Sequence, residues 1–236
     1  MDNSVVIVSG GLDSVVLLHH ICKDLNERNV NVLTFNYGQR IVREIECAKY
    51  HANLLKEQGY VNSHKVLDLS VFGELAKGSA LTNLNIDVPK VTDDLGNAQP
   101  VTYVPFRNLL FLTFAAAHAE SNKGSEVYYG AQNADEHSGY WDTNSHFLGS
   151  VNTIFNLNRK NPVTVKAPFI KFDKDEIVKI GKRLGVDFSK THTCYNGTEV
   201  GCGTCVSCAN RIQAFINAGL EDPIEYSVNI PWHTFV

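Results

Sequence analysis

Two groups of residues in this sequence have types and spacings that suit chemistry. The first is the run Ser9-Gly-Gly-Leu-Asp-Ser14, which follows the β-branched residues Val5 to Val8. Its glycines allow a tight turn with exposed N–H groups, and the helical pattern that follows adds the positive end of a helix dipole. Both serines can donate from their hydroxyls, and Asp13 can hold a magnesium ion or an amine of a base ring. The run therefore predicts a phosphate-binding loop, and a turn without a ligand is the alternative.

The second group consists of four cysteines near the end of the chain. They are Cys194, Cys202, Cys205 and Cys208, spaced C-x7-C-x2-C-x2-C with glycines between them. Four thiolates at this spacing can surround one tetrahedral ion, so we expect a metal site with zinc as the ion. An iron–sulfur cluster is the alternative, because similar spacings serve both. A redox role for the C-x-x-C pairs fits less well, and spacing does not decide whether the metal assists the chemistry.

The remaining cysteines, Cys22 and Cys47, fall on helical apolar patterns. Cys47 and His51 lie one turn apart and could share a metal, but no third ligand is close in the sequence. We therefore interpret both cysteines as buried packing residues.

Two common nucleotide-binding motifs are absent. The chain has no G-x-x-x-x-G-K-[ST] and no G-x-G-x-x-G, which argues against a phosphate loop with a lysine and against the usual dinucleotide fold. The run at 9–14 instead resembles the pyrophosphate loop of ATP-pyrophosphatases, which include GMP synthetase, NAD synthetase, argininosuccinate synthetase and tRNA-thiolating enzymes. This resemblance implies cleavage of ATP between the α and β phosphates, with AMP carried on an acceptor oxygen.

The elements that must position these groups alternate along the chain. Strands are expected at 5–8, 30–37, 61–69, 125–131 and 163–167, and helices at 12–28, 44–55, 109–120, 143–158 and 174–184. Asp173 is expected to cap the last of these helices, and Gly185 to end it. Such alternation predicts an α/β fold with a parallel sheet and right-handed crossovers. We expect residues 1–190 to form this α/β domain and residues 191–236 to form a small metal-binding helical region packed on it.

Polar residues cluster where strands of this sheet would end. Residues 70–105 interrupt the alternation, so we expect a loop over the active site there. Arg107 and Asn108 then begin a strongly apolar helix, where an arginine can bind phosphate or carboxylate; a helix cap with a surface salt bridge is the alternative. The polar stretch 130–142 follows the fourth expected strand, which is where ligands bind in open α/β sheets.

Composition excludes several classes of protein. The 236 residues are 44% hydrophobic and 19% charged, with a net charge of −4. This acidic balance disfavours nucleic acid as a partner, and no apolar run approaches the roughly 20 residues that cross a membrane. With no signal peptide recognisable at the N-terminus, we expect a cytoplasmic protein.

Motifs along nearly the whole chain resemble one family, the 7-cyano-7-deazaguanine synthases (QueC family) within the ATP-pyrophosphatase, or PP-loop, superfamily. The matching segments are Ser9–Ser14, Asn36-Tyr-Gly-Gln-Arg40 with Glu44, Tyr103-Val-Pro-Phe-Arg-Asn108, Gly130–Asp135, Ser138-Gly-Tyr140 with Asp142, Thr193-Cys-Tyr-Asn-Gly197, the cysteine cluster and Gly219-Leu-Glu-Asp222. The resemblance implies a Rossmann-like sheet of the adenine nucleotide α-hydrolase type with helices on both faces. It also implies a homodimer.

The activity implied by this resemblance is that of a carbon–nitrogen ligase. Such an enzyme uses 7-carboxy-7-deazaguanine, free ammonia and two ATP with Mg²⁺, and forms 7-cyano-7-deazaguanine for queuosine or archaeosine synthesis. Adenylation turns a carboxylate oxygen into a leaving group, ammonia displaces AMP to give an amide, and a second adenylation allows loss of AMP to a nitrile. Catalysis of this kind depends mostly on positioning and electrostatics.

We expect the following residues to form the site. Asp13, Ser14 and Arg107 are the expected catalytic residues. The expected ATP-binding residues are Val8, Ser9, Gly10, Gly11, Leu12, Asp13, Ser14, Val15, Val16, Leu17, Leu18, Tyr37, Gln39 and Gly130. The expected substrate-binding residues are Arg40, Arg107, Asn108, Asp135, His137, Tyr140 and Asp142.

The chain departs from the family pattern at several positions. Val15 stands where a threonine is usual and Ile41 where a histidine is common, and Gly-Tyr-Pro-Asp-Cys-Arg becomes Gly139-Tyr-Trp-Asp-Thr-Asn144. The lost arginine would suit a carboxylate-bearing substrate, so a member that stops at 7-amido-7-deazaguanine, or that takes a related deazapurine, is one alternative. Another tRNA-modifying ATP-pyrophosphatase is a second, disfavoured by the acidic composition. A non-enzymatic zinc module is a third, but it leaves the loop at 9–14 unexplained.

Overall fold

A computed structural model describes residues 3–93, 99–132 and 139–232 of the chain. Its centre is one five-stranded parallel sheet with the strand order β3-β2-β1-β4-β5. The strands are β1 (Ser4–Ile7), β2 (Val30–Asn36), β3 (Val61–Asp68), β4 (Glu126–Tyr128) and β5 (Thr164–Lys166). Strands β2 and β3 lie on one side of β1, and β4 and β5 lie on the other, so the direction in which strands are added reverses between β1 and β4. Ligands of open α/β sheets bind at the carboxyl ends of the strands beside such a reversal.

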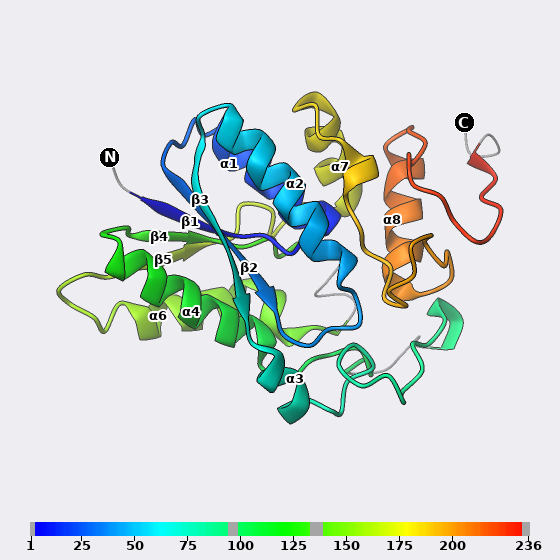
Figure 1. Ribbon diagram of the computed structural model, residues 1–236, viewed down its shortest axis with the longest axis horizontal. Helices are drawn as coiled ribbons and strands as arrows, with labels where there is room; N and C mark the ends of the chain where they lie inside the picture. Colours follow the sequence, from blue (N-terminus) through cyan, green and yellow to red (C-terminus); the bar gives the residue numbers. More distant parts are fainter. Residues whose placement is uncertain (1–2, 94–98, 133–138, 233–236) are drawn as a thin grey trace.

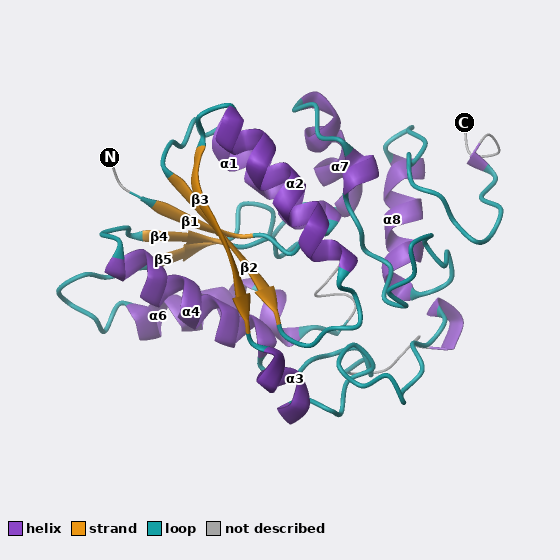
Figure 2. Cartoon of the chain, in the orientation of Figure 1, coloured by secondary structure: helices purple, strands orange, loops and turns teal. Residues whose placement is uncertain are grey.

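Helices cover both faces of the sheet (Figure 1). They are α1 (Leu12–Lys23), α2 (Arg43–Glu57), α3 (Ser70–Leu75), α4 (Arg107–Ser121), α6 (Ser145–Phe155), α7 (Lys174–Arg183) and α8 (Val206–Asn217). Short 3₁₀ turns lie at Val91–Asp93, Trp141–Thr143 and Phe188–Lys190. Figure 2 shows α1, α2 and α7 on one face, α4 and α6 on the other, and α8 beside α7 near the C-terminal end. The predicted α/β fold with a parallel sheet is confirmed.

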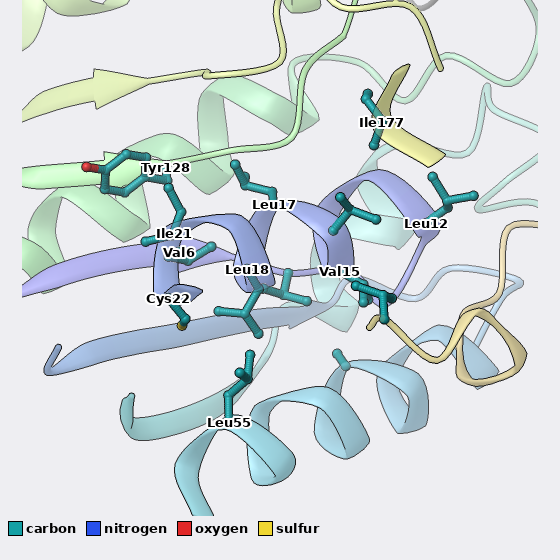
Figure 3. Packing of buried hydrophobic residues seen from close by; sticks show 14 of the residues in the cluster. Val6, Leu12, Val15, Leu17, Leu18, Ile21, Cys22, Leu55, Tyr128 and Ile177 are labelled. Carbon is teal, nitrogen blue, oxygen red and sulfur yellow. The ribbon is translucent and has the colours of Figure 1, made fainter. Parts of the chain in front are cut away.

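Alternation along β1 sends its side chains into two separate cores. Val6 packs into a cluster with α1, α2, α7 and α8, whereas Val5 packs into a cluster with α4 and α6. Leu12 and Leu17 of α1 and Ile177 of α7 all belong to the first cluster (Figure 3). Phe215 of α8 belongs to the same cluster, so the C-terminal helix shares a core with the sheet's first helix. Burial on both faces explains why the strands are nearly continuous apolar runs.

Two of the sequence predictions about helices are wrong in their bounds. Helix α1 ends at Lys23 and not at residue 28, because Asn26 and Asn29 take positive φ angles of 53° and 62°. The expected helix 143–158 is shorter, because the Asn144 side chain accepts the Phe147 N–H at 2.8 Å and starts α6 at Ser145. The capping of α7 by Asp173 is confirmed, with a reciprocal capping box to Glu176.

The connection between β3 and α4 contains regular structure that was not predicted. Helix α3 follows β3 directly, because the Asp68 side chain accepts the Ser70 N–H at 2.9 Å. Six residues are too few for a periodic apolar pattern, which is why the sequence predicted only a loop. Among the described residues, no helix combines the length and hydropathy needed to cross a membrane.

The loop after β1 and the first turn of α2 lie in direct contact. Gly10 has a φ of 102°, and a Cβ placed on it would lie 1.8 Å from the Glu44 carbonyl oxygen. No side chain fits in that space, and the backbone conformation strongly favours glycine. The turn of the loop and the position of α2 therefore depend on the absence of a side chain at Gly10.

The Gly10→Ala variant is expected to lose about 3 kcal/mol or more of unfolding free energy, because backbone strain and the clash add. Chemical denaturation measures this loss. Gly149→Ala is the matched control, since nothing lies within 4 Å of a Cβ at this position of α6. It should gain up to about 1 kcal/mol from helix propensity. Equal stability of the two variants would contradict the contact between the loop and α2.

Candidate active site and metal centre

The loop at 9–14 directs its backbone N–H groups toward the hydroxyls of Ser9 and Ser14, which lie 3.1 Å apart. The Ser14 hydroxyl oxygen accepts hydrogen bonds from the N–H groups of Ser9 at 3.2 Å and Gly10 at 3.3 Å. The Gly11 N–H donates to the Ser9 hydroxyl at 3.1 Å. These donors lie at the start of α1, where the helix dipole adds positive potential. The arrangement is suited to binding the oxygens of a phosphate group.

A carboxylate and an ammonium group lie beside the loop. Asp13 Oδ2 pairs with Lys174 Nζ at 3.0 Å, which joins the first turn of α1 to the first turn of α7. Asp13 Oδ1 is buried and accepts no hydrogen bond from any described residue. One oxygen of the carboxylate is therefore held by the lysine, and the other is available to a ligand.

A cavity of about 230 Å³ extends from this loop between the carboxyl ends of the strands. Many residues expected to bind ATP or substrate line it, namely Val8, Ser9, Gly11, Asp13, Ser14, Tyr37, Gln39, Arg107, Asn108, Gly130 and Tyr140. Gly130 also lies close to the loop, since a Cβ on it would be 3.3 Å from the Ser14 backbone. The motif residues are thus brought together from β1, β2, α4 and the segment after β4.

Other expected site residues lie elsewhere. Leu12, Val15, Val16, Leu17 and Leu18 are fully buried in the core around α1 and do not line the cavity. The expectation that these side chains contact ATP is therefore corrected. They pack α1 against the sheet and support the loop from the core. Gly10 belongs to the loop but does not line the cavity, and it packs against the Glu44 backbone.

Two expected substrate-binding residues are placed behind the cavity wall. Arg40 donates to the carbonyls of Asn83 at 3.1 Å and Ile86 at 2.8 Å, and it does not line the cavity. Asp142 is buried, and its backbone carbonyl accepts from the Asn108 amide at 3.3 Å. Both residues therefore support the wall of the site. Asp135 and His137 lie outside the described residues.

Arg107 supplies positive charge to the cavity. It begins α4 directly after Phe106, which takes the left-handed conformation with a φ of 56°. Its guanidinium donates to the Tyr37 hydroxyl at 3.1 Å. Burial lowers the pKa of Arg107, but the Tyr37 oxygen and the Asp142 carboxylate outweigh this and hold the pKa above its usual value. The arginine stays charged and can bind an anion in the same cavity as the loop.

Several lining residues were not predicted. Glu44, Lys174, Thr193, Tyr195 and Ser207 line the cavity. The sequence did carry a signal for three of them, because Thr193 and Tyr195 flank Cys194 and Ser207 lies between two cysteines of the cluster. Glu44 belongs to a matching motif but was not assigned to the site, and nothing in the sequence marked Lys174. Most of the remaining lining is apolar, including the stacked rings of Phe35 and Phe111 with centroids 4.1 Å apart.

The four clustered cysteines form a site that fits a single metal ion. Their sulfur atoms all lie within 4.8 Å of one another, and Cys202 Sγ is 3.9 Å from Cys208 Sγ. Tetrahedral Zn–S bonds of about 2.3 Å would place the sulfurs about 3.8 Å apart. Backbone N–H groups point at the sulfurs, with Cys202 N donating to Cys194 Sγ and Cys205 N to Cys202 Sγ, both at 3.3 Å. Such hydrogen bonds stabilise thiolates.

The other candidate metal pair in the sequence was Cys47 and His51, and in the structure His51 packs against a second histidine, His19. His51 Nδ1 lies 3.0 Å from His19 Nε2, and both rings are fully buried between α1 and α2. Burial lowers the pKa of His19 to about 3 and that of His51 to about 4. Both rings are therefore neutral at physiological pH, and the only described group of three or more possible metal ligands is the cysteine cluster.

Comparison with known sequences identifies one family. The sequence model of the family described as "Queuosine biosynthesis protein QueC" matches residues 3–219. A 7-cyano-7-deazaguanine synthase from Caldicellulosiruptor saccharolyticus is 39% identical over 231 residues, covering 97% of each chain. A 7-cyano-7-deazaguanine synthase 1 from Colwellia psychrerythraea is 40% identical over 222 residues, covering 94% of this chain and 97% of that one.

Solved structures share the fold at low identity. The NMN synthetase from Francisella tularensis has a TM-score of 0.53 at 12% identity, covering 93% of this chain and 78% of that chain. A U34-tRNA thiolase, NcsA from Methanococcus maripaludis with its [4Fe-4S] cluster, has a TM-score of 0.51 at 14% identity, covering 90% and 64%. Identities this low support the fold and carry no information on the metal or the substrate.

The metal centre can be tested with single cysteine variants. Cys208→Ser should remove the bound metal, because a neutral hydroxyl replaces one of four thiolate ligands. Metal analysis of the purified protein measures this loss. Cys22→Ala is the matched control, since Cys22 is buried in the core around α1, and it should keep its metal. Retention of full metal by Cys208→Ser would show that the cluster is not the binding site.

Proposed function

The chain belongs to the QueC family, and we propose from this premise that it converts 7-carboxy-7-deazaguanine and ammonia to 7-cyano-7-deazaguanine at the expense of ATP. One observation carries the proposal beyond the family match. A single cavity is lined both by the phosphate-binding loop and by Arg107, so a nucleotide and an anionic acceptor can meet there. The chemistry requires such a meeting, because the acceptor's oxygen must reach the α-phosphate of ATP.

The loop and Asp13 are proposed to bind ATP with its magnesium ion. The N–H groups of residues 9–11 and the Ser14 hydroxyl are suited to the pyrophosphate oxygens. Asp13 Oδ1 is buried without a hydrogen-bond partner among the described residues, and carboxylate oxygens suit Mg²⁺. Lys174, paired to the other oxygen of Asp13, adds positive charge on the same side. When bound, Mg²⁺ stabilises charge that develops on the leaving pyrophosphate.

Arg107 is proposed to bind the acceptor's carboxylate. Its guanidinium is charged and already oriented by Tyr37. Asn108 and Tyr140 supply amide and hydroxyl groups nearby in the lining, and the rings of Phe35 and Phe111 give an apolar surface for a flat heterocycle. Orientation of this kind lets one carboxylate oxygen attack the α-phosphate, while the arginine offsets the charge of two anions brought together.

The cysteine cluster is proposed to hold zinc as a structural ion. Sulfur separations of no more than 4.8 Å suit one ion, whereas an iron–sulfur cluster distributes its cysteine ligands over several iron atoms. All four ligands come from cysteine, which is the pattern of closed structural sites. Zinc would therefore fix Thr193, Tyr195 and Ser207, which are cavity residues beside the ligands, and take no part in the reaction.

A product that stops at the amide is the second candidate. Where the family pattern has an arginine, Asn144 caps α6 and does not line the cavity. Among the described residues, Arg107 is the arginine that lines the cavity, so binding of the substrate carboxylate then depends on it. The identity of the product distinguishes the two candidates.

Purified protein with ATP, Mg²⁺, ammonia and 7-carboxy-7-deazaguanine should form AMP, pyrophosphate and the nitrile, as measured by mass spectrometry. Recovery of the amide alone would replace the nitrile with the second candidate. No AMP formation dependent on 7-carboxy-7-deazaguanine would contradict the proposal as a whole.

Asp13→Ala should lower AMP formation by about 10²-fold or more, the effect expected when electrostatic support of the leaving group is lost. Its metal content should stay unchanged, because the cysteine cluster is separate. Asp87→Ala is the matched control, since Asp87 is exposed in the connection before α4. Loss of both AMP formation and metal in Asp13→Ala would indicate a folding defect in place of a catalytic one.

A further inference from the structure

Glu44 brings an acidic side chain into a cavity that otherwise suits anions. It lies in the first turn of α2, whose backbone packs on Gly10. Its carboxyl lies beside the next residue of the loop, since Glu44 Oε1 is 3.5 Å from the position of a Cβ on Gly11. The glutamate lines the same cavity as Arg107 and the phosphate-binding loop.

The surroundings of Glu44 leave its carboxyl available to a ligand. It makes no hydrogen bond or ion pair with another described residue, whereas Asp13, the other carboxylate among the described lining residues, is paired with Lys174. The charged and titratable groups that face Glu44 are Arg107 of α4, Tyr37 directly after β2 and Cys47 of its own helix. Burial raises the pKa of Glu44 to about 8, although Arg107 opposes the shift.

A glutamate at this position carries no positive charge with which to bind the phosphates of ATP or the carboxylate of the acceptor. A permanent negative charge would repel both, whereas a carboxyl that titrates near neutral pH adds little charge to the empty cavity. The proposed reaction also needs a group that takes up protons from the nitrogen, and a base works best when its pKa lies near the working pH. Asp13 is poorly suited to this task, because its Oδ2 is already paired with Lys174.

We propose that Glu44 is a catalytic residue that binds the ammonia nucleophile and accepts a proton from it as the nitrogen attacks the adenylated carboxylate. This inference rests on the proposed function and extends it to the nitrogen half of the reaction. It assigns the two described carboxylates that line the cavity to separate steps, with Asp13 acting in adenylation and Glu44 in amide formation.

The step balances in atoms and charge. The ammonia nitrogen forms a bond to the carbonyl carbon, and the bond from that carbon to the oxygen of the adenylate breaks. AMP leaves with this oxygen and its electron pair. One of the three ammonia protons passes to Glu44 Oε, and the product is the amide with two protons on nitrogen. Glu44 then releases its proton to solvent before the next turnover.

Glu44→Gln separates the two steps experimentally. The substitution keeps the size of the side chain and removes its ability to accept a proton. Exchange of labelled pyrophosphate into ATP, driven by 7-carboxy-7-deazaguanine without ammonia, reports adenylation alone and should stay unchanged. Amide formation should fall by about 10²-fold or more, the usual contribution of a general base. Hydroxylamine, which is unprotonated at neutral pH and a stronger nucleophile, should restore much of the rate.

A pH profile provides a second readout. At a fixed concentration of free ammonia, the wild-type rate of amide formation should fall as the pH drops below the pKa of Glu44, because the protonated carboxyl accepts no proton. This dependence should be lost in Glu44→Gln. Glu46→Gln is the matched control, because the Glu46 side chain is 69% exposed on the same helix and pairs with Lys49, and it should behave as wild type.

Two results would overturn the inference. Loss of pyrophosphate exchange in Glu44→Gln, with Glu44→Asp equally impaired, would assign Glu44 to ATP, magnesium or acceptor binding or to folding. Unchanged amide formation in Glu44→Gln would remove its role as a base. Failure of the proposed function is distinguishable from both, since the wild-type protein would then show no exchange dependent on 7-carboxy-7-deazaguanine.

Discussion

Three segments that are far apart in the sequence meet at Gly10, and the site depends on this contact. The Glu44 carbonyl and the Ala48 nitrogen occupy the space that a side chain on Gly10 would need. From the other direction, the His192 N–H donates to the Gly10 carbonyl at 3.1 Å. The loop after β1, helix α2 and the segment leading to the cysteines are thus held in one arrangement. Because that contact is made by backbone atoms, it tolerates little displacement, and it holds Glu44 and His192, the residue before Thr193, against the same loop.

The cysteine cluster lies close enough to the cavity to shape its wall. Thr193, Tyr195 and Ser207 line the cavity and are neighbours of metal-ligand cysteines in the sequence. On its other side the cluster contacts the long connection before α4, where Lys90 forms a β-bridge with Cys205 and the Val91 N–H donates to the Thr204 carbonyl at 2.9 Å. Behind it, Arg211 and Asp222 form a fully buried ion pair. An ion that joins the four sulfurs would therefore stiffen the part of the cavity that faces the loop.

Local patterns in the sequence predicted the sheet, the loop at 9–14 and the cysteine cluster, because each of these is encoded by neighbouring residues. Gly130 was predicted by a more general rule, since ligands bind at the carboxyl ends of parallel strands, and Arg107 by its place at the start of a strongly apolar helix. The predictions along α1 failed at Val15 to Leu18, because proximity to the loop in sequence does not give these side chains access to the cavity; helical periodicity turns them into the core. Lys174 could not be predicted, because its contact with Asp13 depends on how α7 packs against α1. The role inferred for Glu44 likewise required the contact between α2 and Gly10.

The central claim is that a carboxylate oxygen of the acceptor attacks the α-phosphate of ATP inside this cavity. Oxygen-18 placed in both carboxylate positions of 7-carboxy-7-deazaguanine tests it most directly, with the products analysed by mass spectrometry. Each AMP should carry one labelled oxygen, the first from adenylation of the carboxylate and the second from adenylation of the amide, and pyrophosphate should carry none. Label in pyrophosphate or in inorganic phosphate, or AMP free of label, would contradict the account.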